Sequence, residues 1–106
     1  MKIKKGTYRF AASNGWKTEE GSYAVCYPFF IHRKTKSKLW SLSHLATGYS
    51  VKTALTLKDA KTLAKYLESF SLFLVPTLET FTKQLEIHKR KHPLKHAEMI
   101  RRITGK

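Results

Sequence analysis

Histidine is the side chain with which this sequence could most readily hold a metal ion or move a proton. His88, His92 and His96 follow one another at intervals of four residues. On an uninterrupted helix they would line one face within reach of a metal, but Pro93 falls between the second and the third. No cysteine or suitably placed carboxylate completes the set. We therefore expect no physiological metal site and no cofactor, although His88 and His92 alone could bind nickel or zinc weakly in vitro.

His32 and His44 are the candidates for acid–base chemistry. His32 precedes Arg33, and a histidine beside a cation can act as an acid or base on a phosphate ester. However, no two histidines have a spacing that implies cooperation, and the carboxylates are too scattered for a metal-dependent phosphodiesterase. Neither a P-loop nor a dinucleotide-binding glycine fingerprint is present. We expect no catalytic residue, and we expect His44 to be a core or boundary histidine.

Positive charge is the strongest feature of the composition. The chain has 106 residues, with 21 Lys and Arg against 7 Asp and Glu, which gives a formal net charge of +14. Hydrophobic residues make up 42% of it and aromatic residues 12%, which is too apolar for a disordered basic tail. Cys26 is the only cysteine, so an internal disulfide, a cysteine-based zinc finger and a CxxC redox site are all excluded. We expect Cys26 to be a small buried hydrophobe.

The sequence favours a cytoplasmic location. The longest apolar run, residues 23–31, is interrupted by Pro28 and is too short to cross a bilayer. The basic start of the chain is not followed by a hydrophobic stretch, so we expect no secretory signal. A single free cysteine suits a reducing cytoplasm, which we assign to a microbe or a mobile element.

Alternation of apolar and polar residues predicts a sheet in residues 1–55. We expect residues 16–21 to form a loop or wide turn and residues 33–38, with four cations, to form a polar connector. Pro28 predicts an edge position or a bulge within its strand. The short connections predict antiparallel strands in meander order. The predicted strands are 5–12, 22–32, 39–45 and 49–55.

Apolar residues at helical spacing predict helices in residues 56–106. Thr56 is the expected N-cap of an amphipathic helix that ends before Pro76 and covers one face of the sheet. A second helix is predicted from near Thr77, with a break near His92 and a final helix after it.

Together these elements predict a single basic α+β domain over residues 1–106. We expect an antiparallel meander of three to four strands followed by two to three helices, in the order ββββααα. A strand meander followed by one amphipathic helix resembles the small AP2-like and integrase N-terminal DNA-binding domains, which present a three-stranded sheet to DNA. The resemblance covers about residues 22–70 and rests on strand order and on the helix over residues 56–67.

The charge is unevenly distributed along the chain. Residues 1–54 carry ten cations and two acids, residues 55–75 three cations and two acids, and residues 76–106 eight cations and three acids. In the helical half, acids stand four residues before cations, an arrangement that stabilises a helix. These predicted pairs are Glu79–Lys83, Glu86–Arg90 and Glu98–Arg102. The cations of the sheet half have no comparable partners, so a polyanion is the expected reason for them.

Strand phase predicts which side chains share a face. We expect the first helix to be faced by Tyr8, Phe10, Trp40, Leu42, Tyr49 and Val51. The opposite face would then present Arg9 and Lys52, with small hydroxyl residues around them: Thr7, Ser41, Ser43 and Ser50. Such a face can contact phosphates and base edges. A twisted antiparallel ribbon can enter the major groove of DNA, and the connector can then hold the flanking sugar–phosphate backbone. The alternative is an ordinary solvated sheet face.

We therefore predict a non-catalytic nucleic-acid-binding protein, with DNA favoured over RNA. It would use the basic sheet face and the connector, with the basic C-terminal helix as a second contact. The predicted binding residues are Arg9, Arg33, Lys34, Lys36, Lys38, Lys52, Lys89, Arg90, Lys91, Arg101 and Arg102. Trp16 either pins its predicted loop to the core or stacks on an unpaired base, so the sequence leaves duplex and single strand open.

Two other functions stay open from the sequence. The protein could be a small inhibitor or assembly factor that docks on an acidic protein surface, in which case the charge serves steering. It could also be a small nuclease or a messenger-RNA-cleaving toxin. We expect no membrane partner, because the apolar residues of the basic region 86–106 are too few for anchoring.

Overall fold

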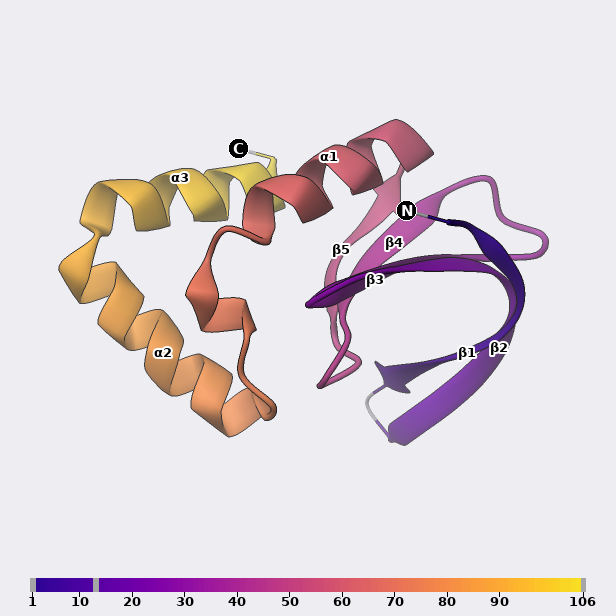
Figure 1. The fold of residues 1–106 in the computed structure, drawn as a ribbon, viewed down its shortest axis with the longest axis horizontal. Helices are drawn as coiled ribbons and strands as arrows, with labels where there is room; N and C mark the ends of the chain where they lie inside the picture. Colours follow the sequence, from indigo (N-terminus) through magenta and orange to yellow (C-terminus); the bar gives the residue numbers. More distant parts are fainter. Residues whose placement is uncertain (1, 13, 106) are drawn as a thin grey trace.

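Five strands precede three helices in the fold (Figure 1). The structure is a computed structural model that describes residues 2–12 and 14–105. The strands pair antiparallel in the order β1-β2-β3-β4-β5, so the α+β class and the meander are confirmed, with five strands rather than three or four. The elements are β1 (Lys4–Ala12), β2 (Gly15–Cys26), β3 (Phe29–Lys34), β4 (Trp40–His44), β5 (Ser50–Leu55), α1 (Leu57–Leu67), a 3-10 turn η1 (Ser71–Phe73), α2 (Leu78–Lys91) and α3 (Pro93–Thr104).

The predicted strand over residues 22–32 is wrong in its bounds. It contains the end of β2 and the start of β3, which are joined at Tyr27 and Pro28 by a turn with a cis peptide bond. Residues 16–21, expected to be a loop, are the first half of β2 and pair with β1. They escaped prediction because most of this stretch is exposed, and an exposed strand does not show the alternation of a half-buried one.

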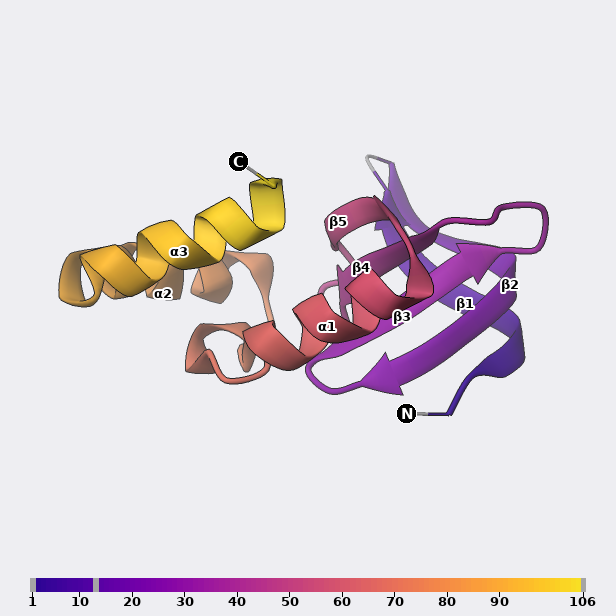
Figure 2. The ribbon, with the colours of Figure 1, turned by 90° about the horizontal axis from the view of Figure 1, so that it is seen from above.

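One face of the sheet carries the main core. Ile31 of β3 and Leu42 of β4 stand opposite each other in register, and both are fully buried. Helix α1 packs on β3, β4 and β5 through its apolar stripe, as predicted (Figure 2). Its N-terminus is capped as expected, since Thr56 Oγ1 accepts a hydrogen bond from the Asp59 N–H at 3.1 Å. The predicted contact between the first helix and the sheet is therefore confirmed.

The β1–β2 hairpin curls over the opposite face of the sheet (Figure 1). The ring centroids of Tyr8 and His32 are 4.7 Å apart, and those of Phe10 and His32 are 6.0 Å apart. The far end of β1 is fastened to the β4–β5 turn, because the Ala11 N–H donates to the Gly48 carbonyl at 2.8 Å. The prediction that Tyr8 and Phe10 face the first helix is therefore wrong, because strand twist carries this long hairpin over the other side.

The last two helices extend to one side of the sheet (Figures 1 and 2). They are separated at His92, as predicted from Pro93, whereas α1 ends at Leu67, earlier than the stop expected at Pro76. In α2, all of which the structure describes, no residue is fully buried, and residues of β5, α2 and α3 line an apolar pocket of about 320 Å³. In the described part of the chain, no helix is both long and apolar enough to cross a membrane.

Candidate nucleic-acid interface

Strand pairing gathers cations at one end of the sheet. Lys5, Ser22 and Arg33 stand opposite one another across β1, β2 and β3, and Lys34 follows in the next row, opposite Gly21. The connector after β3 adds two exposed lysines. We call this group of cations the connector cluster. Its members are Lys4, Lys5, Arg33, Lys34, Lys36 and Lys38. Lys4 and Lys5 were not among the predicted binding residues, because their place beside Arg33 depends on strand register.

The connector that carries these cations is braced against the sheet. The Arg33 guanidinium donates to the Ser37 carbonyl at 2.6 Å, and its carbon lies 5.4 Å from the centre of the Trp40 ring. Thr35 donates to the Glu20 carbonyl twice, from its N–H at 3.2 Å and from its hydroxyl at 3.1 Å. A guanidinium has five N–H donors, so Arg33 keeps donors for a ligand while it holds the connector in place.

The cluster keeps a net positive charge. Lys34 Nζ lies 3.7 Å from a carboxylate oxygen of Glu19, and the Lys34 side chain is 64% exposed. Ion pairs this exposed contribute at most about 1 kcal/mol, so a phosphate can compete for the lysine. Glu20 is the other acid on these strands. Six cations against two acids leave the connector cluster as a cationic end of the sheet.

Arg9 and Trp16 form a pair on the β1–β2 hairpin. Both are exposed, and the Arg9 guanidinium carbon lies 4.7 Å from the centre of the Trp16 ring. The Trp16 ring also packs against Gly48, so closely that a Cβ at Gly48 would lie 2.3 Å from Trp16 Cζ3. Trp16 therefore pins the hairpin to the β4–β5 turn, and the residue remains 50% exposed.

Lys52 is not where the sequence predicted it. It stands opposite Leu42 and so shares the face that α1 covers. A Cβ at Gly105, the C-cap of α3, would lie 3.3 Å from Lys52 Nζ, which places this ammonium at the carbonyl end of the helix. The phase prediction failed because the β4–β5 register shifts beside Leu42 and Ala54 has a positive φ of 59°.

The predicted hydroxyl residues do not form an open face around Arg9. Ser43 is 1% exposed, and its Oγ lies 2.8 Å from His32 Nε2. Ser41 is half-buried and Ser50 is exposed, and both line a trough beneath the β1–β2 hairpin. The flat basic face expected from strand alternation is thus replaced by a curled sheet with a trough inside the curl.

The C-terminal cations divide into two sets. Lys89, Arg90 and Lys91 are exposed at the C-terminal end of α2. Arg101 and Arg102 instead both bind Glu98, with N···O distances of 2.6 Å and 3.4 Å. The hydrogen bond from Arg101 lowers the pKa of Glu98.

The intrahelical pairs predicted in the helical half have different outcomes. Glu79–Lys83 is formed at 3.8 Å and Glu98–Arg102 at 3.4 Å. Within residues 2–12 and 14–105, no ion pair shorter than 4.0 Å joins Glu86 to Arg90. Arg102 also stacks on an aromatic ring, with its guanidinium carbon 4.6 Å from the centre of the Tyr66 ring.

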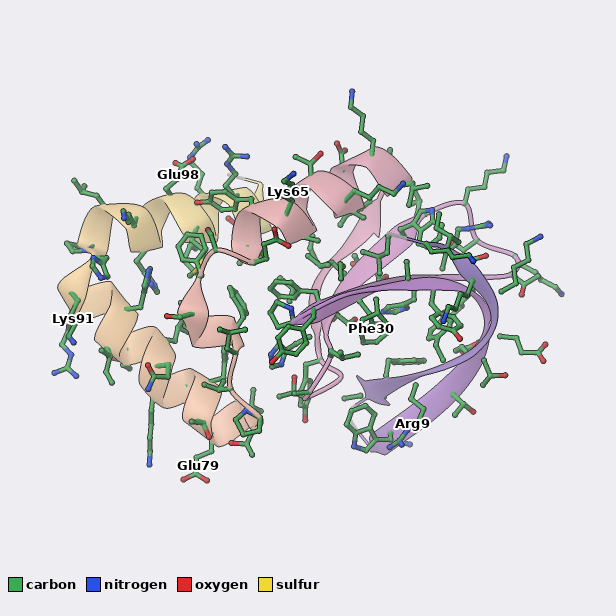
Figure 3. All side chains as sticks on the ribbon, in the orientation of Figure 1. Arg9, Phe30, Lys65, Glu79, Lys91 and Glu98 are labelled. Atoms are coloured by element: carbon green, nitrogen blue, oxygen red, sulfur yellow. The ribbon has the colours of Figure 1, made fainter. Side chains whose placement is uncertain are left out.

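The two sets of exposed cations lie at opposite ends of the molecule. The connector cluster is at the strand end of the long axis, whereas Lys91 lies at the helical end (Figures 1 and 3). The longest dimension is 41 Å. At about 3.4 Å per base pair, only a duplex of about twelve base pairs or more would reach both sets.

The two candidate acid–base histidines are buried. His32 is 9% exposed, and burial lowers its pKa to about 4, so the ring is neutral at physiological pH. His44 is 5% exposed; its Nε2 lies 2.6 Å from the Phe73 carbonyl, and its Nδ1 lies 2.9 Å from the Thr47 hydroxyl. Because a carbonyl only accepts, Nε2 is the donor and His44 joins β4 to η1. His44 is thus a core histidine, as expected.

The three histidines of the helical half meet across the α2–α3 break. The Nδ1 atoms of His88 and His96 are 3.1 Å apart, and the ring centroids of His88 and His92 are 5.4 Å apart. Burial and the neighbouring His96, His92 and Lys95 lower the pKa of His88. Among the residues that the structure describes, no three His, Cys, Asp or Glu side chains are grouped as a metal site requires.

Cys26 packs against the core with its thiol half-buried. Burial, with a smaller effect from Glu68, raises its pKa to about 11. The thiol is therefore protonated at neutral pH and is a poor nucleophile.

The structure has braced cations at one end of a sheet, an exposed arginine–tryptophan pair on a hairpin and a second cationic set toward the other end of the 41 Å long axis. Side chains of these kinds bind phosphate backbones and acidic protein surfaces. Comparisons of the chain with protein-family models, with curated proteins and with solved structures find no match.

Proposed function

We propose that this protein binds nucleic acid without catalysis, with duplex DNA as the favoured partner. The observation that carries the proposal is the connector cluster, in which strand register adds Lys4 and Lys5 to the four cations of the Arg33–Lys38 segment. Like charges held this close repel one another and destabilise a fold, so their retention needs another benefit. Neutralising phosphates with release of counterions provides one.

The β1–β2 hairpin supplies the element that enters a groove in this proposal. Thr7, Arg9 and Thr18 are exposed on it, and the connector cluster lies at its base. The major groove, about 12 Å wide, admits a two-stranded ribbon. Backbone contacts by the cluster would then fix the ribbon in place, in the way that phosphate contacts set register.

The second contact is the end of α2, with Lys89, Arg90 and Lys91. The other predicted cations are less suited, because Arg101 and Arg102 are bound to Glu98 and Lys52 lies at the end of α3. The proposal includes a cytoplasmic location, supported by the single cysteine, which the structure shows as a free thiol.

The test is a binding titration against duplex DNA, single-stranded DNA and RNA of equal length at several salt concentrations. Six phosphate contacts predict a slope of log K on log salt of about −5 for duplex. The nucleic acid should remain uncut. Absence of binding to all three at low salt would remove the proposal and favour an acidic protein partner.

A matched pair of lysines shows whether the cluster is the site. Lys34 and Lys83 each pair with a glutamate, at 3.7 Å and 3.8 Å, and their side chains are 64% and 74% exposed. Lys34→Ala should weaken binding and make the salt slope about one unit shallower. Lys83→Ala should change neither. Equal effects would show that net charge alone, and not the cluster, determines binding.

A further inference from the structure

A trough lies beneath the β1–β2 hairpin, on the side of the sheet opposite α1. It has a volume of about 410 Å³, within the range of about 300–1,000 Å³ that small-molecule sites occupy. One edge strand supplies one wall, the other edge strand supplies the opposite wall, and the central strands supply the floor. The residues on which the argument rests are Tyr8, Phe10, His32, Ser43, Ser50 and Thr53.

The floor and one wall of the trough are aromatic. The His32 ring lies at 25° to the Phe30 ring with centroids 4.8 Å apart, and at 14° to the Phe10 ring with centroids 6.0 Å apart. Tyr8 is buried against the same histidine, whereas Phe10 is half-buried. Packing of this kind holds flat aromatic surfaces in fixed positions. Such surfaces can stack on any planar nucleobase, because every base has a flat aromatic face.

His32 also presents a free ring nitrogen. Its Nε2 is taken by Ser43 Oγ, and within residues 2–12 and 14–105 no protein atom is hydrogen-bonded to its Nδ1. In that same part of the chain, no fully buried polar side-chain atom lacks a partner, so Nδ1 is not fully buried, and His32 is one of the residues that line the trough. Burial lowers the pKa of His32 to about 4, so this nitrogen belongs to a neutral ring. Exposed hydroxyls of Ser50 and Thr53 stand on the same trough.

The connector cluster also contributes to the lining of the trough. Arg33 and Lys34 line it, and Lys34 is exposed. A ligand that combines an uncharged planar ring, hydrogen-bonding edges and an adjacent phosphate matches a trough that is lined by aromatic, hydroxyl and cationic side chains. Nucleotides have these parts in this arrangement.

We propose that the trough binds one unpaired nucleobase, with its phosphate on Arg33 and Lys34. This inference rests on the proposed nucleic-acid binding and adds to it the capture of a base. The base would come from a single strand or frayed duplex end, or from a free nucleotide, because the recognised chemistry is the same.

Two DNA strands of equal charge test the trough. One is a ten-nucleotide oligothymidylate, and the other has the same number of phosphates but no bases. The electrostatic contribution is equal for both, so we expect the thymidylate strand to bind about tenfold tighter through its base. Equal affinities would overturn the trough proposal while leaving the proposed function standing. Failure of both strands to bind at low salt, while duplex DNA binds, would overturn the trough proposal alone, and failure of duplex DNA and RNA as well would overturn both proposals.

A blocking variant locates the base. Thr53 is exposed and lines the trough, so Thr53→Phe should fill the trough without entering the core. It should abolish the tenfold difference in affinity between the thymidylate and abasic strands. Binding of the abasic strand should stay unchanged, which would also show that the variant is folded. Thr82→Phe, at an exposed threonine of α2, is the control and should retain the tenfold difference. If Thr53→Phe does not fold, Ser50→Phe repeats the test from β5. A difference that persists in a folded blocking variant would overturn the proposal.

Competition by thymidine 5′-monophosphate distinguishes the two sources of the base. Displacement of the strand by the mononucleotide, but not by deoxyribose 5-phosphate, would assign the trough to nucleotides in general. Displacement by neither, with the strand difference intact, would assign it to a nucleotide within a strand. Equal displacement by both would show that phosphate alone is recognised and would overturn base capture.

Discussion

The connector cluster and the C-terminal cations carry similar charge in different surroundings. Arg101 and Arg102 share Glu98, and Lys89 to Lys91 stand at the C-terminal end of α2, where cations stabilise a helix. In the cluster, only the Lys34–Glu19 ion pair is formed within the described residues. The C-terminal cations therefore have structural roles as well as the proposed second contact, whereas the proposed partner is the main reason that we can give for the charge of the cluster. Substitutions in the two regions should consequently separate stability from binding.

The largest effect that we expect is a loss of stability at acid pH, which should come more from His32 in the sheet half than from His88 in the helical half. The pKa of His32 is about 4 in the folded protein and about 6.5 in an unfolded chain. A histidine with a lowered folded pKa contributes its stability fully above about pH 6.5 and loses it as pH falls toward 4. The loss is about 3 kcal/mol, at 1.36 kcal/mol per pKa unit. The pKa of His88 is lowered too, but that side chain is less buried, so its loss is smaller.

Urea unfolding between pH 7 and pH 4 measures this loss. His32→Gln removes the titrating ring and retains a polar side chain for Ser43. The variant should be less stable than the parent at pH 7 and should lose less stability between pH 7 and pH 4. An identical pH dependence in parent and variant would show that another group causes the acid sensitivity.

Removal of charge from each region should give opposite results. The triple substitution of Lys5, Lys36 and Lys38 by Ala should weaken duplex binding about 100-fold near 0.1 M salt, because about three counterion-releasing contacts are lost. The melting temperature should stay unchanged or rise, since repulsion is relieved.

The matched triple substitution of Lys89, Arg90 and Lys91 by Ala should lower the melting temperature and weaken binding far less. Calorimetry and the salt titration give both readouts for each variant. Equal losses of binding from the two triples would remove the distinction between the regions.

The fastening of the β1–β2 hairpin can be tested at two glycines. Gly48 has φ of +74° and no room for a Cβ beside Trp16, whereas Gly15 has φ of +113° and, among the residues that the structure describes, no atom within 4 Å of a built Cβ. Gly15→Ala should cost backbone strain alone, whereas Gly48→Ala should cost strain and displace the hairpin. We expect a loss of about 2 kcal/mol at Gly48 and about 1 kcal/mol at Gly15. Urea unfolding with tryptophan fluorescence measures both, and equal losses would show that Trp16 does not fasten the hairpin.

Features that depend on a single helix or strand could be predicted from the local sequence. The N-cap at Thr56, the helix break before Pro93 and the buried face of Trp40 and Leu42 all follow from residue type and period. The placement of Lys52 does not follow, because the shift of the β4–β5 register reverses the alternation on which the prediction relied.

Features that depend on pairing between distant strands could not be predicted. Lys5 reaches Arg33 through two strand pairings, and half of β2 has no amphipathic pattern. The trough requires the curl of the β1–β2 hairpin, which is a property of twist and of the Ala11–Gly48 hydrogen bond. The candidate site is thus a tertiary feature, although each of its cations is visible in the sequence.

The smallest expected effect comes from the two acids that neutralise cations in the two regions. Glu19→Gln frees Lys34 and should strengthen nucleic-acid binding by up to about fivefold, the limit set by an exposed ion pair of about 1 kcal/mol. Glu98→Gln weakens the contacts of Arg101 and Arg102 within α3, so it should lower the melting temperature slightly and leave binding nearly unchanged. Both substitutions raise the net charge by one. If the two variants bound equally more tightly, overall charge would explain binding; a gain confined to Glu19→Gln requires a local site at the connector cluster.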